Sequence, residues 1–460
     1  MFGEGPVHMV GVCGSGMASL AELLMQWGVR VSGSDKVRGD SFWRLLNAGA
    51  SLCVGHSARN LPPGCRLLVH SAAVPTSNPE IVAAKKRNIP ILKYSQMLGS
   101  ISRHFRTIAV AGSHGKTTVT AMVVKALHDA FFPCSFVVGG EAYQLRALPR
   151  SPKAPFFVTE ACEFDRSFLN LRRSIAVVTN IEPDHLDYYG TEENLFEAFW
   201  RFASGAEEFA VLNADDAGCR RLAKRLSKPV VTFGRAKDAQ FRILHSDDIG
   251  RVTIRHSGGT TVMRLSVIGE HNCHNAACAF ALLSTLGLSC SAVAASLSSF
   301  RGVARRLQVI SRSSPVVIDD YAHHPTEIKA VVRTVKEAFP PKPLFVFQAH
   351  QHSRLLALFD DFVAAFSGAD DVLLLPVYSV REGAEMRCRI NHAALGVALQ
   401  TRGVRVRVAT SFEEGYEILR READDFSAVC FMGAGDIYRL ARALAATSKS
   451  KAAERARYAG

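Results

Sequence analysis

Residues 107–118 read Thr-Ile-Ala-Val-Ala-Gly-Ser-His-Gly-Lys-Thr-Thr, an apolar run followed by a glycine turn. The run predicts a buried strand and residues 119–127 predict a helix, so the turn joins a strand to a helix. In that setting backbone N–H groups and the helix N-terminus bind phosphate, Lys116 reaches the β- and γ-phosphates, and the Thr117 hydroxyl binds Mg²⁺. Valine at 110 replaces the first glycine of the common motif, so the loop is a shortened variant. The stretch predicts a nucleotide-binding α/β domain.

A second glycine turn lies upstream, at Gly11-Val-Cys-Gly-Ser-Gly16, again between an apolar strand and a helical pattern. Asp35 follows Gly11 by 24 residues, near the place of a ribose-binding acid in a nicotinamide-binding unit. The glycine order is GxxGxG rather than GxGxxG. Taken alone, the turn indicates a diphosphate or nucleotide, or a purely structural tight turn.

Short apolar runs alternate with helical patterns along the rest of the chain, which is typical of βαβ units and parallel sheets. The spacing predicts an α/β fold of three domains: a Rossmann-like N-terminal domain at 1–103, a P-loop ATPase-like central domain with a mainly parallel sheet at 104–307, and a Rossmann-like C-terminal domain at 308–460. Residues 230–267 alternate more strongly, and we expect antiparallel strands there.

The composition is that of an ordinary globular protein, with 48% apolar and 21% charged residues among 460. The net charge of +13 favours anionic ligands, but the basic residues are scattered among acids, so we expect no nucleic acid partner. No run of 18 apolar residues exists, and we expect no membrane insertion. An acid at Glu4 argues against a secretory signal, and eleven cysteines without a CxxC pair predict reduced thiols and a cytoplasmic location.

Two acidic clusters follow predicted strands downstream of the phosphate loop, at 160–165 and 180–187. Because the carboxyl ends of parallel strands line the ligand crevice, acids placed there are natural Mg²⁺ ligands. The alternative is that they are solvated loop acids and helix caps.

Four further stretches are rich in His, Asn and Arg: 269–275, 300–306, 319–327 and 347–354. Asn can pair with an adenine edge, and Arg can clamp phosphate or carboxylate. His323 and His324 indicate either a metal site or a polar binding surface, and the spacing does not decide between them.

Taken together, these motifs resemble the Mur ligase family, and within it the alanine-adding branch. The resemblance runs from Val7 to about Ile437 and follows the family's motif order. It rests on GxxGxGM at 11–17, SGSD at 32–35, AGSHGKTT at 111–118, TNIEPDHLD at 179–187, HNxxN at 271–275, AHHPTE at 322–327 and MGAGD at 432–436.

The resemblance implies an ATP-dependent ligase that joins L-alanine to the carboxylate of UDP-N-acetylmuramate through an acyl phosphate, with ATP and Mg²⁺ required, for peptidoglycan precursor synthesis. It implies a monomer or a homodimer. The UDP-sugar lies on the N-terminal domain, where the glycine turn meets the diphosphate and an acid meets the uracil. The residues that it assigns to the UDP-sugar are Gly14, Ser15, Gly16, Asp35 and Ser71.

The same resemblance implies that Asn275 contacts the adenine, Arg306 the transferring phosphate and Asp320 the ribose. The catalytic residues that it implies are Lys116, His185 and Arg306. The remaining residues that it assigns are Gly112, Ser113, His114, Gly115, Lys116, Thr117 and Thr118 for ATP; Thr117, Glu160 and His185 for the metal; and Tyr321, His323, His350 and Arg354 for the amino acid.

The chain departs from the family pattern at several positions. Cys162 and Phe164 replace an acid and a serine beside Glu160, and Gln351 replaces an arginine expected next to the amino-acid carboxylate. The choice among L-alanine, L-serine and glycine therefore stays open. No lysine lies between His185 and Lys224, so the carbamylated lysine of some relatives is absent.

Other functions explain parts of the pattern. A ligase that attaches a whole tripeptide to the same sugar is the nearest, followed by folylpolyglutamate synthetase, which leaves the N-terminal glycine turn unexplained. A nicotinamide oxidoreductase explains Gly11 and Asp35 but not Lys116. A nucleotide-binding module without activity is the last alternative.

Overall fold

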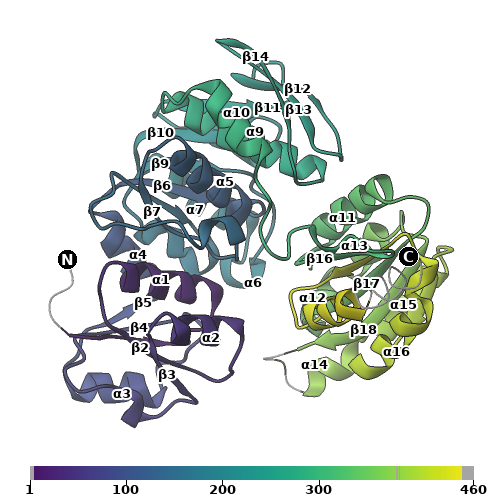
Figure 1. The fold of residues 1–460 in the computed structure, drawn as a ribbon, viewed down its shortest axis with the longest axis horizontal. Coiled ribbons are helices and arrows are strands. Elements are labelled where there is room, and N and C mark those ends of the chain that lie inside the picture. The colour runs from purple at the N-terminus through teal and green to yellow at the C-terminus, as the bar shows by residue number, and fades with distance from the viewer. Residues whose placement is uncertain (1–4, 380–381, 383, 448–460) are drawn as a thin grey trace, which may run out of the picture. The chain divides into compact units, whose positions relative to one another are not determined.

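A computed structural model describes residues 5–379, 382 and 384–447, and its strands form three sheets that follow one another along the chain (Figure 1). The first sheet has five parallel strands in the order β3-β2-β1-β4-β5, which is a doubly wound arrangement. Its elements are β1 (Val7–Val10), α1 (Ser15–Gln26), β2 (Val31–Asp35), α2 (Asp40–Asn47), β3 (Ser51–Val54), η1 (Ala58–Asn60), β4 (Leu67–His70), α3 (Pro79–Lys86), β5 (Ile91–Lys93) and α4 (Tyr94–Ser102).

The second sheet has nine strands in the order β14-β13-β12-β11-β10-β9-β6-β8-β7. Its central strands are apolar runs buried on both faces, as in parallel sheets covered by helices. Its elements are β6 (Arg106–Ala111), α5 (Lys116–Asp129), β7 (Cys134–Val137), η2 (Tyr143–Leu145), β8 (Phe156–Glu160), η3 (Phe164–Asn170), β9 (Arg173–Val178), α6 (Leu186–Tyr189), α7 (Glu192–Ser204), β10 (Ala206–Asn213), α8 (Ala217–Arg225), β11 (Val230–Gly234), β12 (Phe241–Ser246), β13 (Arg251–His256), β14 (Gly259–Arg264), α9 (Glu270–Thr285) and α10 (Cys290–Ser298).

The third sheet has the order β15-β16-β20-β17-β18-β19 and is parallel except for the edge pair β15 and β16. A further helical stretch covers residues 438–447. The other elements are β15 (Gln308–Ser311), β16 (Val316–Asp320), α11 (Pro325–Ala338), β17 (Pro343–His350), α12 (His352–Ala357), α13 (Phe359–Ala365), β18 (Asp371–Tyr378), α14 (Ala384–Arg389), α15 (His392–Gln400), β19 (Arg405–Val408), α16 (Phe412–Glu422), η4 (Ala423–Asp425) and β20 (Ala428–Met432).

The predicted α/β fold with three mainly parallel sheets is confirmed. In the region 230–267, where we expected antiparallel strands, β11 pairs in parallel with both β10 and β12, so that expectation does not hold for β11. The strong alternation of apolar and polar residues in this region reflects the exposure of one face of the outer strands β12, β13 and β14. The boundaries at 104 and 308 stay a prediction, and residues 448–460 of the predicted third domain lie outside the described residues.

Two compact units account for the described residues. Unit 1 contains the first sheet and most of the second, with chain ranges up to 245, 252–264 and 274–300; unit 2 contains 246–251, 265–273 and the chain from 301. The chain therefore passes from one unit to the other after residues 245, 251, 264, 273 and 300.

Within unit 2, the short segment 246–251 is tied to α11. The buried carboxylate of Asp248 accepts a hydrogen bond from Thr334 Oγ1 (2.6 Å) and pairs with Arg333 Nε (3.3 Å). In the described part of the chain, no helix combines the length and apolarity needed to cross a bilayer.

Candidate active site

The loop between β6 and α5 has the backbone shape that phosphate binding needs. Gly112 and Gly115 adopt φ values of 137° and 84°, which side chains rarely allow. A Cβ at Gly112 would collide with the Thr179 hydroxyl, and one at Gly115 would lie 2.5 Å from Asn275 Oδ1. Both glycines are thus required by close neighbours, and Asn275 of α9 lies directly against the loop.

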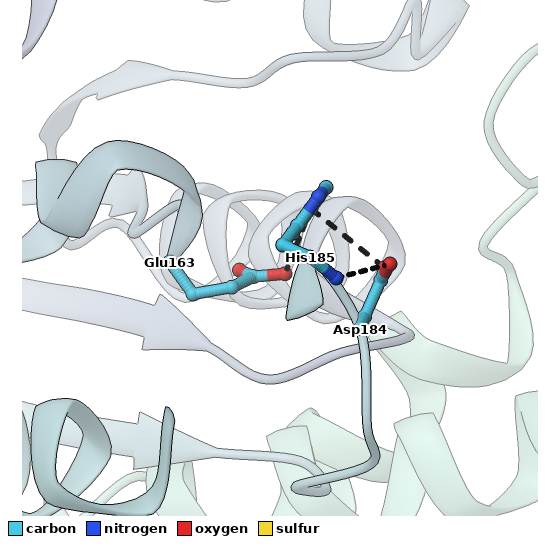
Figure 2. A group of neighbouring side chains, drawn as sticks. All are labelled: Glu163, Asp184 and His185. Atoms are coloured by element: carbon cyan, nitrogen blue, oxygen red, sulfur yellow. Dashed lines mark hydrogen bonds and ion pairs between the residues drawn. The ribbon is translucent and has the colours of Figure 1, made fainter. Parts of the chain in front are cut away.

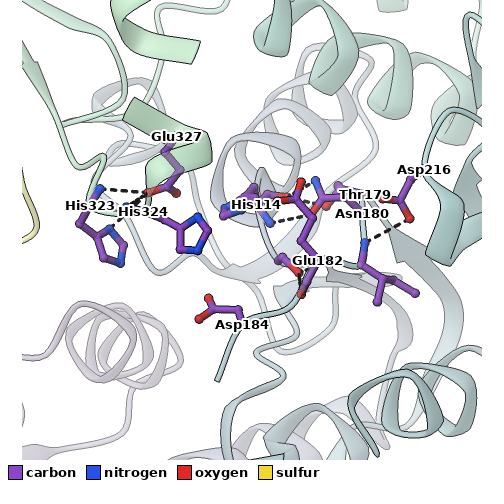
Figure 3. Close-up of polar contacts among 12 residues, drawn as sticks. His114, Thr179, Asn180, Glu182, Asp184, Asp216, His323, His324 and Glu327 are labelled. Atoms are coloured by element: carbon purple, nitrogen blue, oxygen red, sulfur yellow. Dashed lines mark hydrogen bonds and ion pairs between the residues drawn. The ribbon is translucent and has the colours of Figure 1, made fainter. Parts of the chain in front are cut away.

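Two loop residues are fixed by the segment that follows β9 (Figure 3). The His114 N–H donates to Asn180 Oδ1 (2.8 Å), and the Ser113 hydroxyl donates to the Glu182 carbonyl (3.0 Å). Thr118, in the first turn of α5, is buried. The structure thus brings the predicted phosphate loop and the second acidic cluster together.

Lys116 is largely buried and is held in place by acceptors within unit 1. Its Nζ donates to the carbonyl of Ser113 (3.1 Å) and to Glu163 Oε1 (3.0 Å), and it also contacts the Gly112 carbonyl. Burial is the largest single effect and disfavours the ammonium ion, but Glu163, Cys162 and Glu160 together outweigh it and raise the pKa of Lys116 above its ordinary value. The lysine is therefore a fixed cation at the phosphate loop.

Two of the three predicted metal ligands contact each other. The Thr117 hydroxyl donates to Glu160 Oε2 (2.9 Å), and the other Glu160 oxygen accepts from the N–H of Gly139. A hydroxyl and a carboxylate placed side by side at a phosphate loop could hold Mg²⁺, which prefers oxygen ligands.

The third predicted ligand, His185, belongs to a neighbouring group with Glu163 and Asp184 (Figure 2). His185 Nε2 lies 3.9 Å from Glu163 Oε1 and 3.7 Å from Asp184 Oδ2. The Glu163 side chain is only 2% exposed, and its Oε2 atom has no hydrogen-bond partner. A buried carboxylate oxygen without a partner beside a second carboxylate and an imidazole fits a divalent cation.

The predicted UDP-sugar residues gather at the carboxyl end of the first sheet. Asp35 ends β2, and its Oδ2 accepts the N–H of Cys13 (2.8 Å), which fixes the glycine turn. A Cβ at Gly11 would lie 3.1 Å from the Cβ of Ser71, so the turn and the end of β4 are in contact. Gly14 caps α1, whose first residues are Ser15 and Gly16, and the helix N-terminus faces the anion site predicted here.

In unit 2, Arg306 and Asp320 lie near the start of the third sheet. Arg306 Nη1 is 3.5 Å from Glu327 Oε1, and its guanidinium lies over the Tyr321 ring. Asp320 is buried, and its two oxygens accept the N–H groups of Leu307 and Ala322. Burial raises the pKa of Asp320 to about 6. In this structure Asp320 organises the backbone, and its ribose contact stays a prediction.

Three of the four predicted amino-acid ligands form a row at the carboxyl ends of β16 and β17. The rings of Tyr321 and His323 are 5.3 Å apart, and those of His323 and His350 are 6.1 Å apart. The N–H of His323 donates to Glu327 (3.1 Å), as Figure 3 shows. Arg354 lies on α12, the helix that follows β17.

Sequence reasoning gave no individual role to Glu163 or Asp184, although both lie inside the two acidic clusters. The available signal was position: each cluster follows a strand end. Which acid faces the loop depends on irregular turns, with φ of 54° at Asp165 and 56° at His185, and no simple pattern predicts such turns.

Family models cover most of the chain. The Mur ligase family, catalytic domain model matches residues 6–106; the Mur ligase middle domain model matches 110–283; and the Mur ligase, glutamate ligase domain model matches 305–435.

Similar proteins span the same length. The UDP-N-acetylmuramate–L-alanine ligase of Clostridium novyi (strain NT) is 36% identical over 448 residues, covering 94% of this chain and 96% of that one. The enzyme of that name from Paenarthrobacter aurescens (strain TC1) is 38% identical over 445 residues, covering 94% and 95%. The crystal structure of UDP-N-acetylmuramate–alanine ligase from Thermotoga maritima has a TM-score of 0.82 at 27% identity, covering 97% and 100%. A murein peptide ligase from Psychrobacter arcticus shares the fold, with a TM-score of 0.70 at 23% identity, covering 96% and 99%.

Proposed function

The chain belongs to the Mur ligase family, and from this premise we propose that it joins L-alanine to the carboxylate of UDP-N-acetylmuramate at the expense of ATP. The observation that carries the proposal is the similarity, over 94% of the chain, to relatives that bear the name of this reaction. The proposal places the enzyme in peptidoglycan precursor synthesis and in the cytoplasm, as a monomer or a homodimer.

The chemistry explains why the site needs so many fixed cations and donors. A carboxylate is a poor acyl donor, so ATP first converts it to an acyl phosphate, the amine then attacks, and phosphate leaves. Triphosphate and sugar carboxylate repel each other, and preorganised positive charge must offset that repulsion in the transition state. Lys116, held at the end of the phosphate loop, supplies part of that charge.

The remaining roles are assigned as part of the proposal. Mg²⁺ would neutralise phosphate charge, and the residues that would hold it are Thr117, Glu160 and His185. Asn275 contacts the adenine. Arg306 meets the transferring phosphate and Asp320 the ribose. The residues that bind the amino acid are Tyr321, His323, His350 and Arg354.

A phosphate-release assay tests the function directly. The purified protein is incubated with ATP, Mg²⁺, UDP-N-acetylmuramate and L-alanine, and each component is then omitted in turn. We expect phosphate release only when all are present, together with a product heavier than the UDP-sugar by one alanine residue.

Two results would contradict the proposal. Release that does not depend on the UDP-sugar would remove it from this class of ligase. Product formed only when a tripeptide replaces L-alanine would favour the tripeptide-attaching alternative.

A further inference from the structure

A polar cavity of about 120 Å³ lies within unit 1, between α1, α2 and the segment that follows β7. Ser15, in the first turn of α1, lines it on one side, and Gly140 lines it on another. The residue next to Gly140, Gly139, donates its N–H to Glu160. The cavity therefore lies between the glycine turn of the first sheet and the phosphate-loop group of the second.

The cavity is lined by equal numbers of positively and negatively charged side chains. The three cations that line it are Arg44, Arg146 and Arg150, and the three carboxylates are Glu22, Asp40 and Glu141. Such a lining offers both donors and acceptors but no net charge, so it fits an uncharged polar group better than a phosphate or a carboxylate.

Several of these groups hold one another in position. Arg44 donates to Glu22 (2.6 Å) and to Glu141 (2.7 Å), and Arg146 also contacts Glu141. Arg150 is only 6% exposed; it donates to Glu22, but its Nε has no hydrogen-bond partner. A buried donor without a partner costs free energy unless a ligand or a water accepts from it.

One wall of the cavity is apolar. Phe136, Val138, Ala142 and Leu145 line it, and each is at most 5% exposed. At roughly 30 Å³ per water in the liquid, the volume equals about four waters. The cavity thus accommodates a substituent of about four heavy atoms with an apolar end, a hydrogen-bond acceptor and a donor.

We propose that this cavity binds the 2-acetamido group of the UDP-sugar acid, an inference that rests on the proposed function. The carbonyl oxygen accepts from the arginines, the amide N–H donates to a carboxylate, and the methyl group packs against the apolar wall. Leu145 and Glu141 then determine which N-acyl group the enzyme accepts.

The order of substituents on the sugar supports this assignment. The anomeric carbon carries the diphosphate, the next carbon carries the acetamido group, and the third carries the lactyl carboxylate. The cavity has the same order of neighbours. On one side it is lined by Ser15, which belongs to the glycine turn predicted to bind the diphosphate. On the other side it is lined by Gly140, and the adjacent Gly139 donates its N–H to Glu160. The diphosphate and the lactyl carboxylate then lie at the glycine turn and at the phosphate-loop group, and the uncharged acetamido group lies in the cavity between them.

Binding measurements with two sugar nucleotides test the inference. Calorimetry compares UDP-N-acetylmuramate with UDP-N-propionylmuramate, which is longer by one methylene group. A close-fitting apolar wall discriminates one methylene by about 10-fold or more. We expect the wild type to bind the propionyl analogue at least ~10-fold more weakly, and Leu145→Ala to reduce that ratio below ~3-fold.

A second variant covers the case in which Leu145→Ala does not fold. Glu141→Gln should weaken binding of UDP-N-acetylmuramate at least ~5-fold and leave binding of UDP alone unchanged, since a hydrogen bond to a charged group is lost. Glu193→Gln is the matched control, because Glu193 pairs with Arg221 on the exposed surface far from the cavity lining. It should bind both ligands as the wild type does.

The failures of the two proposals are distinguishable. If the wild type binds no UDP-N-acetylmuramate, the proposed function fails. If it binds both analogues equally, or if Glu141→Gln and Glu193→Gln bind alike, only the cavity assignment is overturned.

Discussion

Glu163 connects the two catalytic side chains predicted for unit 1. Its Oε1 lies 3.0 Å from Lys116 Nζ and 3.9 Å from His185 Nε2, and its own side chain is 2% exposed. The acid therefore fixes the charge and position of the lysine before any nucleotide binds. Cys162 and Phe164 flank it in the sequence, so neither adjacent side chain adds a second carboxylate.

The Glu163→Gln substitution tests that role. It keeps the shape but leaves the Lys116 ammonium without its charged partner, and breaking a buried ion pair costs about 3–5 kcal/mol. We expect the kcat of phosphate release to fall about 10-fold or more, with the affinity for the UDP-sugar nearly unchanged. Glu207→Gln, on an exposed ion pair with Arg172, is the control and should retain wild-type kcat. An equal loss of kcat in both variants would contradict the assignment.

Gln351 is the residue just before α12, with φ of 75°, and its N–H donates to the carbonyl of Tyr378. Replacing it by arginine leaves that backbone strain unchanged, because both residues carry a Cβ. The added cation should lower the KM for L-alanine about 10-fold or more, because a hydrogen bond to a charged group contributes about 1.5–3 kcal/mol.

The measurement compares KM for L-alanine, L-serine and glycine in the wild type, in Gln351→Arg and in the neutral Gln351→Met. If the ratios among the three amino acids are the same in all proteins, Gln351 does not determine specificity.

The sequence could predict the roles of Lys116 and Thr117, because a strand, a glycine turn and a helix determine their positions locally. It could not predict that Glu163 rather than Glu160 contacts the lysine. Three acids within six residues are equivalent in a pattern, and only the irregular turn after β8 separates them.

At the scale of elements, one buried carboxylate on α3 links β1 and β2 of the first sheet to η1. Glu80 of α3 is fully buried and accepts hydrogen bonds from Ser34 of β2 (2.6 Å), from Asn60 (2.8 Å) and from the N–H of Ser57 (3.0 Å). Glu80 Oε2 also lies 2.9 Å from His8 Nε2 on β1. Burial opposes ionisation, but the hydrogen bonds from His8 and Ser34 hold the pKa of Glu80 at about 2.

Glu80→Ala should therefore destabilise the protein by about 3 kcal/mol, since it leaves several buried donors without an acceptor. Because the folded pKa lies below the ordinary value, the stabilisation is present above about pH 4.5 and is lost as the pH falls toward 2. Thermal unfolding at pH 7 measures the difference. Glu208→Ala, on an exposed pair with Arg106, should change the stability by less than about 1 kcal/mol. Equal effects would mean that the Glu80 network is not what links these elements.

No strand was predicted at β3, whose residues are all partly or fully exposed. The other strands of the first sheet were predictable because apolar runs and glycine turns alternate with helical periods. The outer part of the second sheet was not, because a strand exposed on one face alternates whether its neighbours run parallel or antiparallel. β11 and β12 illustrate this ambiguity.

At the scale of the whole molecule, the proposed function gives the first two sheets separate anion sites, one at the turn after β1 and the other at the turn after β6. Lys116→Ala should abolish ATP-dependent turnover and leave UDP-sugar binding within about 2-fold of wild type, because Lys116 Nζ donates to the second loop and to Glu163. Phosphate release and calorimetry measure the two properties. Equal loss of both would show that the sites are not separate.

The chain crosses between the two units five times, and this limits how the protein can be divided into separately expressed parts. Removing everything after residue 300 would also strip the packing partners from 246–251 and 265–273, including Thr334 and Arg333 beside Asp248. Neither half obtained by a single cut at 300 therefore keeps its full set of neighbours. A protease that nicks this connection once should leave two fragments that stay associated until a denaturant separates them.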